Sequence, residues 1–272
     1  MSFVRFALIG ALFLVMDVTL GQAQVPASVT ATAPTSGGPV DPVLIDDLVA
    51  ANRILADQGV LDAYGHVSIR HPANPNRYLI SRAMSPSDVT AADIMEFDLD
   101  SNPVDRRGRS MFLERFIHGE IYKARPDVMA VIHSHSPGVI PFGITSVPLR
   151  PVFHTASFLW VGVPVFEIRD AGGATNMLVG NGALAKALAV TLGDKPVALI
   201  RGHGNVVVGP SVKRATIRAV YTEVNARLQT IALGLGGPVN YISPEEGALR
   251  DKAPGEEGRA WDGWKKKAMQ KQ

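Results

Sequence analysis

Hydrophobic and polar positions follow two periods along this chain, and each period predicts one kind of element. Apolar residues at helical spacing predict helices at 42–58, 110–123, 182–192 and 211–234. Short runs rich in β-branched residues predict strands at 66–70, 77–81, 94–99, 128–132, 163–168, 197–200 and 205–208. Because these elements do not alternate in a regular βαβ rhythm, we expect an α/β domain of three layers with a partly antiparallel sheet.

Details of the pattern place the ends of several elements. Ser110 and Ser211 are suitable N-caps for the helices that follow them. In the first of these helices, Leu113 and Phe116 are expected to begin one apolar stripe that continues through the next turn. A short turn of helix is expected at 87–93.

The N-terminal residues have the pattern of a targeting segment. Arg5 precedes an apolar run at 6–16, and small residues end at Ala23, so we expect residues 1–23 to be a signal peptide. A membrane anchor is the alternative, but the run is shorter than the roughly 18–20 residues of a spanning helix. We therefore expect a periplasmic or secreted protein without membrane association after cleavage, or a cytoplasmic one if the start site is misassigned.

Composition divides the rest of the chain. Residues 24–40 are rich in Pro, Thr, Ser, Ala and Gly and are expected to form a flexible leader. The folded domain is expected at 41–247, followed by a loose polar arm at 248–272. Two aromatic residues of that arm, Trp261 and Trp264, are candidates for docking onto a neighbouring subunit.

The overall composition excludes several classes of function. The chain has 272 residues, 46% of them hydrophobic, which is enough for one substantial core. With 19% charged residues and a net charge of +2, it has no surplus that would attract nucleic acid. It contains no cysteine, so histidine and carboxylate side chains must carry any metal chemistry.

A His-x-His pair supplies the candidate chemistry. In a strand His133 and His135 project to the same face, where two imidazoles can hold one zinc, manganese, iron or cobalt ion. His203 follows another buried strand between two glycines, and Glu114 lies on the preceding helix. Alone, each has an ordinary explanation: hydrogen-bonded histidines, a loop, and a carboxylate paired with His118.

Taken in order, these motifs resemble the class II aldolase/adducin family. The resemblance runs over about 41–237 and rests on Gly65-His66-Val67-Ser68, Glu114 to His118, Arg125-Pro126-Asp127, Val131-Ile132-His133-Ser134-His135 and Leu199-Ile200-Arg201-Gly202-His203-Gly204. It implies a three-layer αβα domain with a central, mostly antiparallel sheet. It also implies a homotetramer with active sites between subunits and one divalent metal per subunit, zinc before manganese, iron or cobalt. The three histidines would hold this metal, with Glu114 as a further ligand or as an acid–base group.

Departures from the sugar-phosphate members indicate a different substrate. Phe112 and Leu113 stand where those enzymes have phosphate-binding serines, and apolar side chains cannot hold a phosphate dianion. Arg82, in Ser81-Arg82-Ala83-Met84-Ser85-Pro86, offers a planar donor for a carboxylate, although an ordinary surface arginine is the alternative. The chain thus resembles the branch of 2-hydroxy-3-carboxymuconic semialdehyde (HCOMODA) and dihydroxyphthalate decarboxylases, which belong to the breakdown of aromatic compounds.

This resemblance implies a metal-dependent carbon–carbon lyase that decarboxylates an oxo- or hydroxy-carboxylate through an enolate. His66, Ser68, Arg82 and Ser85 would bind the small carboxylate substrate. Glu114 or His154 would return a proton to carbon; His154 lies near the position of a tyrosine that the aldolases supply from an adjacent subunit. A histidine that merely packs in an interface is the alternative for His154.

Three other functions remain to be compared. The first is an aldolase or epimerase that acts on a non-phosphorylated sugar or hydroxy-acid. The second is a non-catalytic scaffold, as in the adducins, which lack the metal ligands that this chain retains. The third, a zinc amidohydrolase, would require a repeated β/α-barrel pattern that this sequence lacks.

Overall fold

A seven-stranded sheet forms the middle of the domain, in the order β3-β2-β1-β4-β7-β6-β5. The computed structural model describes residues 33–252 and 257–270, so the expected signal peptide lies outside the described residues. The strands are β1 His66–Arg70, β2 Arg77–Ser81, β3 Ile94–Asp98, β4 Ala130–Ser134, β5 Val165–Phe166, β6 Val197–Ile200 and β7 Gly204–Gly209. All neighbouring pairs are antiparallel except β5 and β6, which are parallel.

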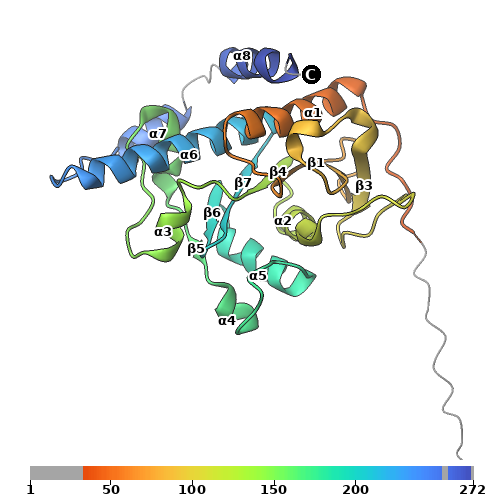
Figure 1. Ribbon diagram of the computed structural model, residues 1–272, viewed down its shortest axis with the longest axis horizontal. Coiled ribbons are helices and arrows are strands. Elements are labelled where there is room, and N and C mark those ends of the chain that lie inside the picture. Colours follow the sequence, from red (N-terminus) through yellow and green to blue (C-terminus); the bar gives the residue numbers. More distant parts are fainter. Residues whose placement is uncertain (1–32, 253–256, 271–272) are drawn as a thin grey trace, which may run out of the picture. The chain divides into compact units, whose positions relative to one another are not determined.

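Helices cover both faces of the sheet (Figure 1). The α-helices are α1 Pro42–Asp57, α2 Phe116–Ala124, α3 Ile140–Ile144, α4 Ile168–Gly172, α5 Gly182–Leu192, α6 Val212–Gly234, α7 Pro244–Lys252 and α8 Glu257–Met269. Short 3-10 helices are η1 Pro86–Asp88, η2 Ala91–Asp93, η3 Leu113–Arg115 and η4 His154–Val161. Each face has its own core, so the expected three-layer αβα class II aldolase-like architecture with a mostly antiparallel sheet is confirmed.

The alternation of side chains along β4 explains the two cores. Ile132 packs with α1, α6 and α8 in one hydrophobic cluster, whereas Val131 packs with α2 and α5 in the other. Because strand side chains alternate, His133 projects to the same face as Val131. The sheet thereby directs this histidine toward the layer that contains α2 and, just before it, Glu114.

The helix before the histidine strand starts later than the sequence predicts. Ser110 does not cap it, because its hydroxyl donates to the carbonyl of Ala83, 3.0 Å away. The chain instead forms η3, in which Glu114 departs from helical geometry, and the α-helix begins at Phe116. Leu113 is 53% exposed and is not part of the buried apolar stripe. In contrast, Ser211 does cap α6, since its hydroxyl accepts from the backbone N–H of Arg214.

The prediction of a loose polar arm at the C-terminus is wrong, because most of the described tail is helical and packed. The predicted domain end at residue 247 falls inside α7, and Trp261 of α8 is 1% exposed within the core shared with α1 and α6. Lys265 pairs with Asp46 and Asp47 of α1 at 2.5 and 2.9 Å. Trp261 therefore docks onto its own chain, and no neighbouring subunit is needed to cover it.

The described end of the leader is also more ordered than its composition predicts. Ser36 and Gly37 donate to the carboxylate of Glu96 in β3, at 2.6 and 2.5 Å. The carbonyl of Thr35 accepts from Arg77 of β2 at 2.7 Å. Polar residues thus anchor this segment to the sheet edge by hydrogen bonds, without any hydrophobic periodicity. Among the described residues, no helix has the length and apolar character required to cross a bilayer.

Candidate metal centre

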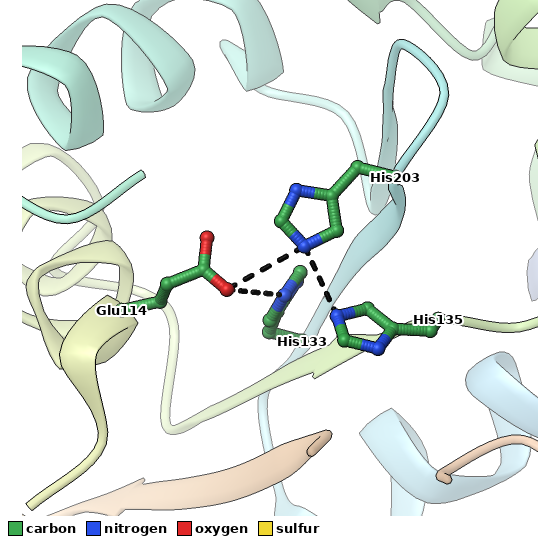
Figure 2. A group of neighbouring side chains, drawn as sticks. All are labelled: Glu114, His133, His135 and His203. Atoms are coloured by element: carbon green, nitrogen blue, oxygen red, sulfur yellow. Dashed lines mark hydrogen bonds and ion pairs between the residues drawn. The ribbon is translucent and has the colours of Figure 1, made fainter. Parts of the chain in front are cut away.

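Four predicted side chains meet at the end of β4 (Figure 2). His133 lies in β4, His135 follows it, His203 lies in the turn between β6 and β7, and Glu114 lies in η3. The antiparallel pairing of β4 with β7 brings that turn beside His135, because Ser134 is paired with Asn205. The predicted ligand set is therefore assembled by sheet register.

Two glycines allow this close approach. A Cβ atom on Gly204 would lie 1.9 Å from the carbonyl oxygen of Ser134, so no other residue fits there without moving a strand. Gly202 has φ +62°, in the left-handed region that favours glycine. Together they hold His203 against the end of β4.

The potential ligand atoms are close to one another. The Nε2 atoms of His133 and His203 each lie 3.4 Å from Oε2 of Glu114. The Nε2 atoms of His135 and His203 lie 3.0 Å apart. One ligand atom from each of the four residues falls within 4.8 Å of all the others. This is the spacing of donors that surround a single ion.

The other ring nitrogen of each histidine has an oxygen acceptor. The Nδ1 partners are the carboxylate of Asp62 for His135 at 2.9 Å, the carbonyl of Met177 for His203 at 3.1 Å and the carbonyl of Asn205 for His133 at 3.2 Å. An acceptor at Nδ1 places the proton there and leaves the lone pair on Nε2. The three lone pairs consequently point into the cluster.

This arrangement fits a bound cation. Two Nε2 lone pairs 3.0 Å apart repel each other unless a proton or a metal ion lies between them. Nε2 of His133 is buried and has no hydrogen-bond partner within the described part of the chain, and a buried acceptor left unpaired is destabilising. Three imidazoles and one carboxylate form a donor set suited to a divalent transition metal.

Charge within the cluster is set by Glu114. Burial alone would raise the pKa of this carboxyl, but the adjacent rings of His133 and His203 hold its pKa well below the usual range. Its Oε1 accepts from the backbone N–H of Val179 at 2.7 Å. Burial lowers the pKa of His133, whereas for His203 the attraction of Glu114 outweighs burial and raises the pKa. Glu114 is thus a fixed negative charge.

His66 and Ser68 lie on the neighbouring strand β1, inside the domain. His66 is paired with His133 across the strands, and their ring centroids are 5.1 Å apart. Nδ1 of His66 contacts Nε2 of His118 at 2.6 Å, and the hydroxyl of Ser68 contacts Nδ1 of the same ring at 2.6 Å and the hydroxyl of Tyr122 at 2.8 Å. His118 is therefore the partner of His66 and Ser68 and not of Glu114. Ser68 is fully buried, so in this packing its hydroxyl stabilises the contact between β1 and α2.

Arg82 and Ser85 lie in the segment that follows β2. Nε of Arg82 donates to Asp93 at 2.7 Å, and the arginine side chain is 39% exposed. The hydroxyl of Ser85 contacts that of Ser87 at 2.8 Å. No hydrogen bond among the described residues joins either side chain to the cluster, so their contact with substrate stays a prediction.

His154 is exposed at the start of η4 and is not one of the four clustered side chains of its own chain. It lines a separate cavity between η4, α6, α7 and α8. The structure therefore does not bring His154 to the cluster within one chain. Its predicted role, which depends on an adjacent subunit, stays a prediction.

Sequence reasoning missed the groups that orient the ligands. Asp62 bonds to His135 and also accepts from the backbone N–H groups of Tyr64 and Gly65. An aspartate three residues before the Gly65-His66 motif is a typical turn former, which was an available signal. The carbonyl of Met177 gave no such signal, because every residue has one.

Comparison with known proteins identifies the family and agrees with the fold. The model of the Class II Aldolase and Adducin N-terminal domain matches residues 46–230. Decarboxylase tropJ of Talaromyces stipitatus is 36% identical over 69% of this chain and 75% of its own length. A 3,4-dihydroxyphthalate decarboxylase of Terrabacter is 32% identical over 78% of this chain and 91% of its own. An aldolase II superfamily protein from Pseudomonas syringae superposes with a TM-score of 0.70 at 26% identity, over 85% of this chain and 95% of its own.

These matches confirm the predicted resemblance to decarboxylase-type members and the prediction of an enzyme of the carbon–carbon lyase class. Both relatives align over most of their own length, and the four potential ligands lie within the matched residues. The chain belongs to the class II aldolase and adducin family.

Proposed function

We propose that this protein is a metal-dependent decarboxylase of an aromatic or ring-derived oxo- or hydroxy-carboxylate, such as a dihydroxyphthalate or a carboxymuconic semialdehyde. The observation that carries the proposal is the convergence of three imidazole lone pairs and one carboxylate on a single point. The decarboxylase relatives support the choice of leaving group. An adducin-like scaffold would have no need for these donors.

The proposed metal is one divalent ion per subunit, held by His133, His135, His203 and Glu114. Zinc is the first choice for three imidazoles and a carboxylate, and the same donors accept manganese, iron or cobalt. When bound, such an ion supplies Lewis-acid stabilisation of the negative charge that develops on substrate oxygen.

The electrostatics of Glu114 favour a ligand role over an acid role. A carboxyl with a strongly lowered pKa is almost always ionised near neutral pH and holds a proton poorly. Its Oε1 is fixed by Val179, which leaves Oε2 directed at the histidines. Loss of CO2 leaves an electron pair on carbon, and that carbon must take up one proton. We assign this delivery to water or to His154 of an adjacent subunit.

The surroundings of the cluster favour a flat, unphosphorylated substrate. The ring of Phe112 lies 4.4 Å from that of His66, which itself lies beside His133. An aromatic wall at this position can pack against a substrate ring and offers no donor to a phosphate. Arg82, together with His66 and Ser85, would orient the carboxylate groups.

Two broader proposals accompany this one. The first is a homotetramer with active sites between subunits, supported by the family and by exposed apolar residues near the end of α6, among them Ile231, Leu233 and Leu235. Light scattering coupled to size-exclusion chromatography tests it. The second is export through residues 1–23, supported by the N-terminal sequence pattern. Mass determination of the mature chain after expression in a bacterial host tests the cleavage.

The test is product analysis with 3,4-dihydroxyphthalate and related hydroxy- and oxo-carboxylates as substrates. Purified zinc-loaded protein should release CO2 in equal amount to the substrate consumed, and chelator should stop the release. An Arg82→Met variant should raise KM more than it lowers kcat, whereas Arg106→Met, on an exposed loop, should change neither. Release of an aldehyde without CO2 would instead identify an aldolase.

A further inference from the structure

A cavity lies between η4, α6, α7 and α8, and none of its lining residues belongs to the metal cluster. Its volume of about 510 Å3 is within the range of small-molecule sites, roughly 300–1,000 Å3. Its walls combine aromatic and basic side chains, namely Phe158, Tyr221, Trp264, Arg214, Arg218 and Arg250.

Arg218 is the unusual member of this lining. Its Nη1 donates to the carbonyl of Val208 at 2.8 Å, but its Nε is buried without a hydrogen-bond partner among the described residues. Burial and the neighbouring Arg214 lower the pKa of this guanidinium, and the weaker attraction of Asp251 and Glu257 offsets only part of that lowering. Arginine nevertheless keeps its charge in proteins, so a half-buried and incompletely bonded guanidinium attracts an anion.

The nearby carboxylates already have a partner. Arg214 donates to Glu257 at 2.8 Å and to Asp251 at 3.3 Å. Within the described part of the chain, no ion pair is formed by Arg218. Arg250 is exposed at the same cavity and adds another positive charge. The cavity thus has a positive surplus that its own acidic residues do not offset.

The aromatic residues give the cavity an apolar side. The ring of Phe158 lies 5.8 Å from Cζ of Arg218, and the rings of Tyr221 and Trp264 are 5.9 Å apart and tilted by 46°. Such walls favour a flat apolar body, and a guanidinium favours a planar two-oxygen anion. A small aromatic carboxylate has both parts.

We propose that this cavity is a second ligand site that binds a small aromatic carboxylate, with the carboxylate on Arg218 and the ring against Tyr221 and Trp264. No residue assigned to this ligand belongs to the metal cluster of the same chain, and His154, which also lines the cavity, is not part of the proposed site. Loss of phthalate binding and loss of the proposed decarboxylation are therefore separate outcomes. Arg250 would stand at the mouth and add attraction for the anion.

Calorimetric titration of the full zinc-loaded chain with phthalate tests the proposal. We expect saturable binding that is weakened about ten-fold or more in Arg218→Gln, since a charge-assisted hydrogen bond is lost. Arg250→Gln, at an exposed position, should weaken binding several-fold and keep the fold. Arg106→Gln, on an exposed loop outside the cavity, is the matched control and should bind as the unchanged protein does.

A His133→Ala, His203→Ala double variant separates this cavity from the metal cluster. If this variant still binds phthalate, the second site is supported. If phthalate binding is lost completely in this variant, the proposal is overturned. Absence of saturable binding at millimolar phthalate also overturns it, as does unchanged affinity in folded Arg218→Gln. If Arg218→Gln does not fold, the affinity of Arg250→Gln decides, and a value equal to that of the unchanged protein overturns the proposal.

Discussion

The Nε2 atoms of His135 and His203 face each other at 3.0 Å, while the Nδ1 atom of each ring is directed at an oxygen. Neither ring can supply the missing proton without becoming a cation. A divalent ion removes the repulsion and satisfies both lone pairs at once. The cluster is therefore less stable without an ion than with one.

Metal should stabilise the folded protein. A ligand that binds only the native state adds about 2.7 kcal/mol to the free energy of unfolding at a hundred times its dissociation constant. We expect the melting temperature of chelator-treated protein to rise on addition of zinc, measured by differential scanning calorimetry. The His133→Ala, His203→Ala variant should not respond. An equal rise in that variant would place the stabilising ion elsewhere.

Asp62 should tune the affinity for metal without touching the ion. Replacement by alanine removes the acceptor that holds the His135 ring, and loss of such an outer partner typically weakens metal binding about 10–100-fold. Competition titration with a zinc-binding dye measures this affinity. Asp105→Ala is the control, because that aspartate is exposed and pairs with Arg107. Similar zinc affinity in the two variants would show that Asp62 does not position His135.

Stability should fall on mild acidification because of His118. Burial lowers the pKa of this ring from 6.5 to about 3, so the unfolded chain binds more protons between these values. Above the unfolded pKa of about 6.5, His118 is neutral in both states and the stability is fully present. As the pH falls from there toward 3, only the unfolded chain takes up the proton, and the free energy of unfolding falls by about 1.4 kcal/mol per pH unit.

Urea unfolding in the presence of chelator measures this dependence. The difference in unfolding free energy between about pH 6.5 and pH 5 should be smaller in His118→Gln than in the unchanged protein. His203, whose pKa is raised, acts in the opposite direction, since its contribution is lost as the pH rises. Identical pH dependence in both proteins would show that His118 is not the group that titrates.

The two glycines beside His203 should differ in their tolerance of a side chain. Gly204→Ala places a Cβ atom against the Ser134 carbonyl and should separate β4 from β7, with loss of zinc binding and a much lower melting temperature. Gly202→Ala meets the flexible end of Met177 at 3.2 Å and Ile144 at an ordinary contact distance of 3.6 Å, and it imposes a positive φ, so we expect about 1 kcal/mol of destabilisation. Calorimetry of both variants tests the order. A milder effect at Gly204 would contradict the described close packing.

Sequence periodicity predicted the sheet because strands carry strong local signals, whereas the ligand set was predicted from the order of several motifs that are weak one by one. The strand that ends in His133 is an apolar run, and the glycines around His203 mark a turn after a buried strand. The prediction for the C-terminal tail was wrong because α8 is polar on one face and is held by Trp261, whose partners on α1 and α6 are distant in sequence. Helix α2 starts late because Ser110 finds its partner in Ala83, another long-range contact.

The groups that orient the metal-binding histidines could not be predicted from the sequence for the same reason. The acceptor for His135 is a side chain from the turn after α1, and that for His203 is the carbonyl of Met177, a non-glycine residue at φ +68°. Neither contact follows from spacing along the chain. Both depend on how loops from different elements close over the end of β4.

Elemental analysis of the purified protein tests the central claim most directly. After exposure to zinc and removal of free ion, the unchanged protein should retain about one ion per chain. A His133→Ala, His203→Ala variant with unchanged far-ultraviolet circular dichroism should retain almost none. Retention of a full equivalent by that folded variant would contradict the assignment of these four side chains as the metal site.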